Sequence, residues 1–235
     1  MPQHPVSWVQ SYLASAALGS AAARRMLTEV STVVDYSNWQ HETFGNAELI
    51  PTKGALWKML SAHIRSSGEE WHALEFGVAF GHATCWWLRH HDKSVIATWD
   101  GFDRFTGLPR SYRHFSTGSF DTGGKTPRIN DDRITWHCGD VEETIGKLDE
   151  SRIASGQRFV LFDLDLYEPS RVAWEWLRPH LQPGDLLYFD EAYDDNERRL
   201  LNEDVLPAGS YSRVAGTAHG IALEVSSISP APSLG

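Results

Sequence analysis

Apolar and polar positions follow one repeating pattern over most of this 235-residue chain. From residue 72 onward, short apolar runs of strand length alternate with stretches in which apolar residues recur at helical spacing. The runs that predict strands are HALEFGV, SVIATWD, RITWHCGD, RFVLFDLDLY and GDLLYFDE. Because strands that alternate with helices form parallel sheets covered on both faces, the pattern predicts a doubly wound, mostly parallel α/β fold.

The C-terminal part departs from this alternation. Two short strand patterns, YSRVAGTA and GIALEVSS, meet at His219 and Gly220, which predicts an antiparallel hairpin at a sheet edge. The last residues, 226–235, contain several Ser and Pro residues and predict a flexible tail. The main domain is therefore expected to span residues 71–225.

The N-terminal part, residues 1–70, has helical spacing and predicts a helical cover ahead of the sheet. Its apolar series are Trp8, Tyr12, Leu13 and Leu18 in one stretch and Leu56, Trp57, Met59, Leu60 and Ile64 in another. Between the two, residues 33–54 mix aromatic side chains with Asn, Gly and Pro. This mixture predicts an irregular segment that either folds over a pocket or simply connects the helices.

Composition narrows the class of partner. The formal net charge is −10 and no block of Lys or Arg stands out, so we expect a small-molecule partner and neither nucleic acid nor an anionic membrane. The only two cysteines, Cys85 and Cys138, indicate a reducing compartment rather than a disulfide scaffold. The N-terminus lacks the basic start of a leader, and no apolar run approaches the roughly 20 residues that span a bilayer. We therefore expect a cytoplasmic protein.

Two acidic pairs carry the strongest functional signal. Asp163 and Asp165 stand at the end of one predicted strand, and Asp190 and Glu191 at the end of the next. The carboxyl ends of parallel strands meet at one edge of a sheet, where such folds bind ligands, so these four carboxylates should gather there. Gathered carboxylates repel each other unless they share a cation or a proton. A hard divalent metal ion is the simplest cation to expect.

A turn that contains glycine follows the first predicted strand. Glu75 ends that strand, and Gly77 and Gly81 lead into the next helix. Glycine permits a sharp turn and lets a ligand approach the backbone closely. The spacing is shorter than the dinucleotide fingerprint GxGxxG, and no P-loop lysine follows, so pyrophosphate recognition is not favoured. An ordinary turn between a strand and a helix is the alternative.

Two further acids follow the second and third predicted strands. Asp100 is placed to accept hydrogen bonds from two vicinal ribose hydroxyls, and Asp140 is placed beside an adenine edge. The alternatives are a turn aspartate for Asp100 and a helix N-cap for Asp140. A ligand with a ribose and a positive charge suits an acidic pocket that lacks a basic phosphate clamp.

Taken in order, these motifs resemble the macrocin O-methyltransferase family of class I, S-adenosylmethionine-dependent enzymes. The motifs that carry the resemblance are EFGVAFG, WDGFDRFTGLP, GSFDT, CGDVEET, FDLDLYEPS and YFDE, and they span roughly residues 70–200. The resemblance implies a Rossmann-like fold, S-adenosylmethionine as cofactor, and a divalent metal ion, usually Mg²⁺. It also implies an O-methyltransferase, whose acceptor is expected to be a small hydroxylated molecule such as a secondary-metabolite sugar or a polyphenol.

The resemblance also assigns roles to individual acids. It places the metal on Asp163, Asp190 and Glu191 and makes Asp165 the candidate general base. Two departures stand out: Glu191 occupies a position where the family usually has Asp, and the loop GSFDTGGKTP differs from the family's version. The longer Glu side chain still offers an oxygen ligand, whereas the different loop leaves the identity of the acceptor open.

The cofactor contacts implied by the resemblance lie at the glycine turn and the first three strand ends. These residues are Glu75, Gly77, Gly81, Asp100, Asp140 and Val141.

Several alternatives stay open at this point. Asp165 serves as the base or only as a structural group, and His82 or His219 could take the proton instead. A metal-dependent glycosyltransferase that uses the DxD at residues 163–165 explains the acids but leaves the glycine turn without a role. A non-catalytic S-adenosylmethionine-binding module would keep that turn but lack an acceptor cavity. The sequence also leaves open whether the chain forms a homo-oligomer.

Overall fold

The computed structural model places the chain in two compact units, Met1–Ala47 and Glu48–Gly235, and each is described by itself. The residues that the structure describes are 9–10, 12–13, 15, 20–45 and 48–229. Trp8 and Leu18 of the predicted N-terminal helix, and residues 230–235 of the predicted tail, lie outside this set.

The first unit contains one long helix, α2 (Ala21–Phe44), within its described residues. The hydroxyl of Ser20 caps its N-terminus by accepting a hydrogen bond from the Ala23 amide at 3.3 Å. The helix ends at Gly45, whose φ of +78° no ordinary side chain adopts easily. Residues 33–44, expected to be irregular, are therefore helical, because no Gly or Pro interrupts the chain before Gly45.

The second unit is built on one sheet, which has seven strands in the described part of the chain. The strands are β1 (Trp71–Phe76), β2 (Ile96–Asp103), β3 (Ile134–Cys138), β4 (Gln157–Phe162), β5 (Leu186–Phe189), β6 (Gly209–Gly216) and β7 (Ile221–Ile228). Their order across the sheet is β3-β2-β1-β4-β5-β7-β6.

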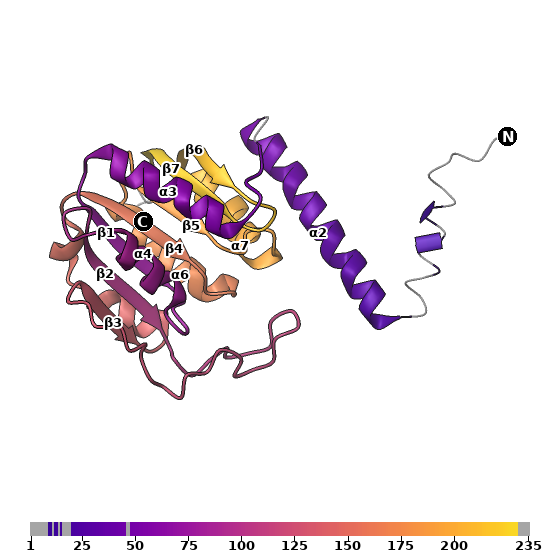
Figure 1. Cartoon of the computed structure of the whole chain (residues 1–235), viewed down its shortest axis with the longest axis horizontal. Coiled ribbons are helices and arrows are strands. Elements are labelled where there is room, and N and C mark those ends of the chain that lie inside the picture. Colours follow the sequence, from indigo (N-terminus) through magenta and orange to yellow (C-terminus); the bar gives the residue numbers. More distant parts are fainter. Residues whose placement is uncertain (1–8, 11, 14, 16–19, 46–47, 230–235) are drawn as a thin grey trace, which may run out of the picture. The chain divides into compact units, whose positions relative to one another are not determined.

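The direction of the strands follows the prediction. Strands β1 to β5 pair in parallel, and β7 runs antiparallel to both β5 and β6. The doubly wound, mostly parallel fold with an antiparallel C-terminal hairpin is thus confirmed (Figure 1). Strand β7 continues to Ile228, so residues 226–228 of the predicted tail belong to the strand.

Helices connect the strands of the second unit. They are α3 (Lys53–Ser67), α4 (His82–His90), α5 (Val141–Thr144), α6 (Tyr167–Leu177) and α7 (Asp195–Leu200), and shorter turns are η1 (Ile145–Lys147), η2 (Glu150–Ile153), η3 (Arg178–His180), the π-helical η4 (Leu201–Val205) and η5 (Leu206–Ala208). Helices α3 and α4 pack on one face of the sheet through a shared hydrophobic core.

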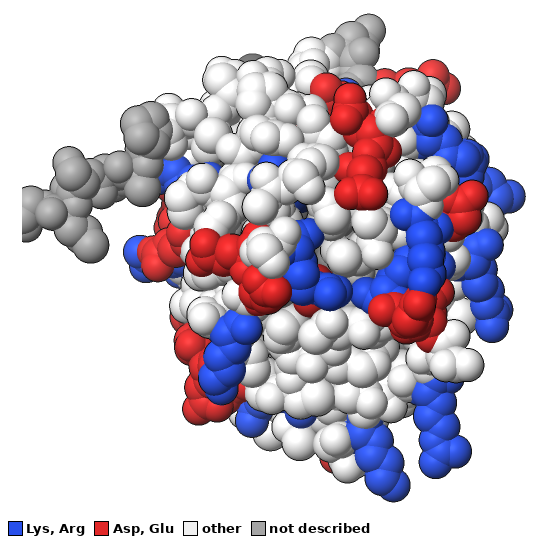
Figure 2. All heavy atoms as spheres, turned by 90° about the vertical axis from the view of Figure 1, so that its left-hand side faces the viewer, with Lys and Arg blue, Asp and Glu red and all other residues white. Residues whose placement is uncertain are grey.

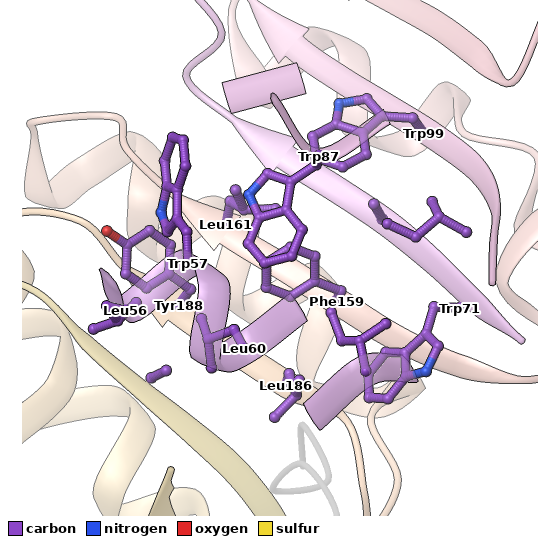
Figure 3. Packing of buried hydrophobic residues seen from close by; sticks show 14 of the residues in the cluster. Leu56, Trp57, Leu60, Trp71, Trp87, Trp99, Phe159, Leu161, Leu186 and Tyr188 are labelled. Atoms are coloured by element: carbon purple, nitrogen blue, oxygen red, sulfur yellow. The ribbon is translucent and has the colours of Figure 1, made fainter. Parts of the chain in front are cut away.

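Helix α3 belongs to the core and not to a separate cover. Leu56, Trp57 and Leu60 of α3 point toward Phe159 and Tyr188 of the sheet (Figure 3). Each is buried, so their apolar area stabilises the docking of α3 onto the strands. The boundary between the two units consequently lies between residues 47 and 48, whereas the sequence predicts it at residue 70.

One face of the molecule mixes charges of both signs. On the face shown in Figure 2, Lys and Arg side chains are interspersed with Asp and Glu, and uncharged surface lies between them. In the described ranges, neither α2 nor any shorter helix combines the length and apolar character that crossing a membrane demands.

Candidate functional site

A row of phenylalanines crosses the sheet where four parallel strands end. Phe102, Phe76, Phe162 and Phe189 come from β2, β1, β4 and β5, and all four are fully buried. They are in register, and the centroids of neighbouring rings are 4.9, 5.5 and 4.8 Å apart. Because the rings form one row, the next residue of each strand emerges at the same edge of the sheet.

The residue after each phenylalanine lies at a single cavity. Gly77, Asp103, Asp163 and Asp190 occupy these four places, and all of them line a cavity of about 810 Å³. Small-molecule sites commonly have volumes of roughly 300–1,000 Å³. The strand ends therefore deliver one glycine and three carboxyl groups to one space of suitable size.

The glycine turn forms part of the cavity wall. Gly77 has a φ of +91°, and a β-carbon there would lie 1.8 Å from the backbone oxygen of Asp163, so only glycine fits. Ala79 also lies in the left-handed region, with a φ of +46°. Gly81, by contrast, precedes α4 beside Pro127 and is not among the residues that line the cavity.

Glu75 lies in the cavity wall one residue before the phenylalanine of β1. Its carboxyl group accepts hydrogen bonds from the Thr84 hydroxyl and, at 2.8 Å, from the indole N–H of Trp99. Burial raises the pKa of Glu75 to about 7, although both hydrogen bonds oppose this shift. A buried carboxyl group of this kind can face a positively charged ligand group.

The structure corrects the prediction for Asp100. Its side chain is fully buried inside β2, where its oxygens are 2.9 Å from Nε2 of His137 and 3.0 Å from Nε of Arg152. It is not among the residues that line the cavity. Strand β2 pairs with its neighbours for three residues beyond the expected end, so the acid that reaches the strand end is Asp103.

Asp103 holds the glycine turn in place. One of its carboxylate oxygens accepts hydrogen bonds from the amides of Val78 at 2.8 Å and Ala79 at 2.7 Å. The other accepts one from the amide of Phe105 at 2.6 Å. Three amides thus fix the carboxylate at the edge of the cavity.

Asp140 and Val141 line the cavity beyond the third strand. Asp140 occupies the N-cap position of α5, but its side chain makes no capping hydrogen bond. Its carboxylate instead lies 2.9 Å from Nε of Arg104 and is about half exposed. Val141 is buried and offers an apolar surface to the same space.

Asp163, Asp165, Asp190 and Glu191 form an acid cluster after the ends of β4 and β5, and all four line the cavity. Burial raises the pKa of Asp163 well above its ordinary value, and Asp190 adds to the shift while Lys53 opposes it. Burial likewise raises the pKa of Asp165 to about 7, and the charges of Glu191 and Asp190 add to it.

Asp165 does not continue the strand. Strand β4 ends at Phe162, and Asp165 has a φ of +62°, which places it in a left-handed turn over the cavity. Of the two histidines considered as bases, His82 lines the cavity. His219 lies outside the cavity lining and packs edge-on against Tyr193, with ring centroids 4.7 Å apart.

Lys53 supplies a positive charge to the acid cluster. Its Nζ lies 2.6 Å from Oδ2 of Asp190, and the side chain lines the cavity. Burial lowers the pKa of Lys53, but the charges of Asp190, Asp163 and Glu191 outweigh burial and raise it overall. Lys53 is therefore an ammonium ion at neutral pH.

The loop after β2 reaches the acid cluster from another direction. The Tyr112 hydroxyl donates a hydrogen bond to Oε2 of Glu191 at 3.0 Å, and a guanidinium nitrogen of Arg113 is 3.5 Å from the same oxygen. The guanidinium also lies over the ring of Tyr193, 4.6 Å from its centroid. Glu191 thus connects this loop to the end of β5.

Comparison with solved structures identifies the fold. The calicheamicin methyltransferase CalS11 aligns with a TM-score of 0.51 and 20% identity over 95% of this chain and 94% of that chain. The chain has a Rossmann-like methyltransferase fold. The O-methyltransferase NovP aligns with a TM-score of 0.49 and 16% identity over 72% of this chain and 80% of that one. The O-methyltransferase TomG from Streptomyces achromogenes aligns with a TM-score of 0.46 and 17% identity over 84% and 90%. No family model and no curated protein sequence matches the chain.

The metal site that the sequence predicts on Asp163, Asp190 and Glu191 does not fit the donors that are present. Among the described residues, no group of three or more His, Cys, Asp or Glu side chains is arranged to hold a metal ion. Asp190 accepts hydrogen bonds from both Lys53 and the Tyr188 hydroxyl, and Glu191 accepts one from Tyr112. Two of the three expected ligands, Asp190 and Glu191, are thus already engaged by protein groups.

Sequence reasoning missed Asp103 and Lys53. A local signal for Asp103 exists, since Phe-Asp recurs at residues 102–103, 162–163 and 189–190, at the ends of β2, β4 and β5, although a fourth Phe-Asp at residues 120–121 lies in a loop. No comparable signal marks Lys53, because its place beside Asp190 depends on how α3 docks onto the sheet.

Proposed function

We propose that the protein is an S-adenosylmethionine-dependent O-methyltransferase that acts on a hydroxyl group of a small molecule. The observation that carries the proposal is the single cavity that joins the glycine turn to the acid cluster. The Rossmann-like methyltransferase fold agrees with it. A volume of about 810 Å³ leaves room for two ligands side by side, as a transfer reaction requires.

The side of the cavity formed by the glycine turn suits S-adenosylmethionine. Gly77 and its turn line this side, and Glu75 offers a carboxyl group to a positive charge. Asp103 takes the ribose-facing place first assigned to Asp100, and Asp140 and Val141 line the wall beyond it. When bound, S-adenosylmethionine supplies a methyl group on a positively charged sulfur: the acceptor oxygen forms a bond to the methyl carbon, and the carbon–sulfur bond breaks with its electron pair left on sulfur.

Asp165 is the residue proposed to take the proton of the acceptor hydroxyl. It lines the cavity, is half-buried and stands in a left-handed turn after β4. A positioned base of this kind typically contributes a factor of roughly 10²–10⁴ to a rate. No step passes through a divalent metal, because Asp190 and Glu191 are paired with protein groups.

The remaining alternatives have less support. Gly77 lines the cavity, and a glycosyltransferase would leave this glycine turn without a role. The cavity also provides the acceptor space that a non-catalytic module would lack. A secondary-metabolite sugar or a polyphenol remains the proposed acceptor class, since its hydroxyl groups match the acidic, partly apolar lining.

Calorimetry with the purified chain tests this proposal. S-adenosylmethionine should bind and raise the melting temperature, since a ligand that binds only the folded state stabilises it by mass action. With a competent acceptor, Asp165→Asn should lower the rate by about 100-fold and leave cofactor affinity unchanged. The absence of any S-adenosylmethionine binding by the wild-type protein would sink the enzyme assignment.

A further inference from the structure

The cation nearest to the acid cluster is a side chain of the protein itself. Lys53 is the first residue of α3, and its Nζ lies 2.6 Å from Oδ2 of Asp190. The same nitrogen lies 5.0 Å from the ring centroid of Trp57, one helical turn further on. Lys53 also lines the cavity together with Asp163 and Glu191, so the ammonium group faces both the carboxylates and the space for the acceptor.

The helix that carries Lys53 is held rigidly. The Thr52 hydroxyl caps α3 by accepting a hydrogen bond from the Ala55 amide at 3.1 Å. Trp57 and Leu60 anchor the next turns in the core beside Tyr188, as Figure 3 shows. The position of the ammonium group is therefore set by the fold, although part of the side chain is exposed.

Two of the carboxylates expected to bind a metal ion already have protein partners. Both oxygens of Asp190 have donors, one from Lys53 and one from the Tyr188 hydroxyl. Oε2 of Glu191 accepts a hydrogen bond from Tyr112. A divalent ion would have to displace the ammonium group from Asp190 and would meet its positive charge at close range.

We propose that the ammonium group of Lys53, and not a divalent metal ion, is the resident cation of the acid cluster. Its three N–H donors allow it to hold Asp190 with one and an acceptor oxygen with another. Lys53 is then a positioning residue that sets the acceptor hydroxyl beside Asp165. The binding part of this inference stands alone, whereas the positioning part rests on the proposed methyl transfer.

A titration with Mn²⁺ on the full-length protein tests the binding part without any acceptor. Lys53→Met removes the charge and keeps the length of the side chain, and Lys58→Met, exposed on the same helix, is the matched control. We expect Lys53→Met to bind Mn²⁺ at least about tenfold more tightly than the wild type, because the carboxylates lose their cation. Lys58→Met and the charge-keeping Lys53→Arg should behave like the wild type. Equal Mn²⁺ affinity of the wild type and Lys53→Met overturns the proposal.

Turnover with a competent acceptor tests the positioning part. Chelation should leave the wild-type rate unchanged, while Lys53→Met should lower kcat/KM by about tenfold or more and recover part of it when Mn²⁺ is added. A wild-type rate that disappears on chelation and returns with metal contradicts the proposal. The two proposals fail separately, because S-adenosylmethionine binding tests the proposed function and Mn²⁺ binding tests the resident cation.

Discussion

The two sides of the cavity hold carboxyl groups in opposite ways. On the glycine-turn side, Asp103 accepts hydrogen bonds from three backbone amides. On the acid-cluster side, Asp190 and Glu191 rely on side chains, those of Lys53 and Tyr112 among them. Both sides begin from the same register, since Asp103 and Asp190 each follow a phenylalanine of the buried row. The difference arises after the strand ends.

This contrast suggests a division of labour. Amides that the fold has already placed give a rigid surface, which suits recognition of a constant cofactor. Side-chain partners can move when a ligand arrives, which suits a variable acceptor and a proton transfer.

The largest effect is expected where the two sides touch. A β-carbon at Gly77 would lie 1.8 Å from the backbone oxygen of Asp163, and the φ of +91° adds strain. We expect Gly77→Ala to lower the free energy of unfolding by at least about 3 kcal/mol, measured by urea denaturation. Gly146→Ala is the control, because a β-carbon there meets no atom within 4 Å. Equal stability of the two variants would show that the sides are not in contact through Gly77.

The next effect concerns Glu75, the carboxyl group on the glycine-turn side whose charge is disfavoured. Its pKa rises from 4.5 to about 7 on burial, so the folded protein keeps a proton that the unfolded chain releases. Its contribution to stability is therefore complete below about pH 4.5 and is lost as the pH rises to about 7, a change on the order of 3 kcal/mol.

The variant Glu75→Gln isolates this contribution, since it keeps an oxygen that accepts hydrogen bonds from Thr84 and Trp99. Unfolding curves between pH 4 and 8 should show the wild type losing stability relative to the variant across this window. Parallel curves for the two proteins would mean that Glu75 ionises in the folded state as it does in water.

The sequence predicts the sheet, and eight of its ten candidate site residues line the cavity, whereas Gly81 and Asp100 do not. Strand alternation and turn chemistry are local, so the parallel sheet, the hairpin and the acids after β4 and β5 could be predicted. The local pattern predicts that β2 ends at Asp100, and not at Asp103, because the true length of β2 depends on its pairing with both β1 and β3. Lys53 escaped prediction because it is 137 residues away from Asp190 in sequence.

The N-terminal region shows the same limit. Residues 33–44 were expected to be irregular because of their aromatic and polar mixture, yet they complete α2. Mixed composition alone does not break a helix when neither Gly nor Pro is present. Single-residue placement at strand ends and helix ends therefore needs tertiary pairing, which local patterns do not contain.

A smaller effect should separate Asp103 from Asp100. Asp103→Asn replaces one carboxylate oxygen by an NH₂ group, which cannot accept a hydrogen bond from the backbone amides. We expect this variant to weaken S-adenosylmethionine binding by about 10- to 100-fold. Asp100→Asn removes the buried negative charge that pairs with Arg152 and should lower stability while changing cofactor affinity by no more than about threefold. Calorimetry and thermal melts on both variants give the comparison. If Asp100→Asn weakened cofactor binding more than Asp103→Asn did, Asp100 and not Asp103 would be the acid of β2 that serves the cofactor.

The smallest effect is expected at the loop that reaches the acid cluster. Tyr112→Phe deletes the hydrogen bond to Glu191 at 3.0 Å and leaves the ring in its apolar contacts with the loop. The free energy of acceptor binding should weaken by about 1 kcal/mol, which appears as a roughly fivefold rise in the KM of the acceptor with kcat almost unchanged. Tyr211→Phe is the control, because no hydrogen-bond partner of that hydroxyl lies among the described residues. Cofactor affinity should stay constant in both variants if side-chain contacts govern only the acid-cluster side. A matching loss of S-adenosylmethionine binding in Tyr112→Phe would mean that the loop controls the whole cavity, and the two sides would then act as one.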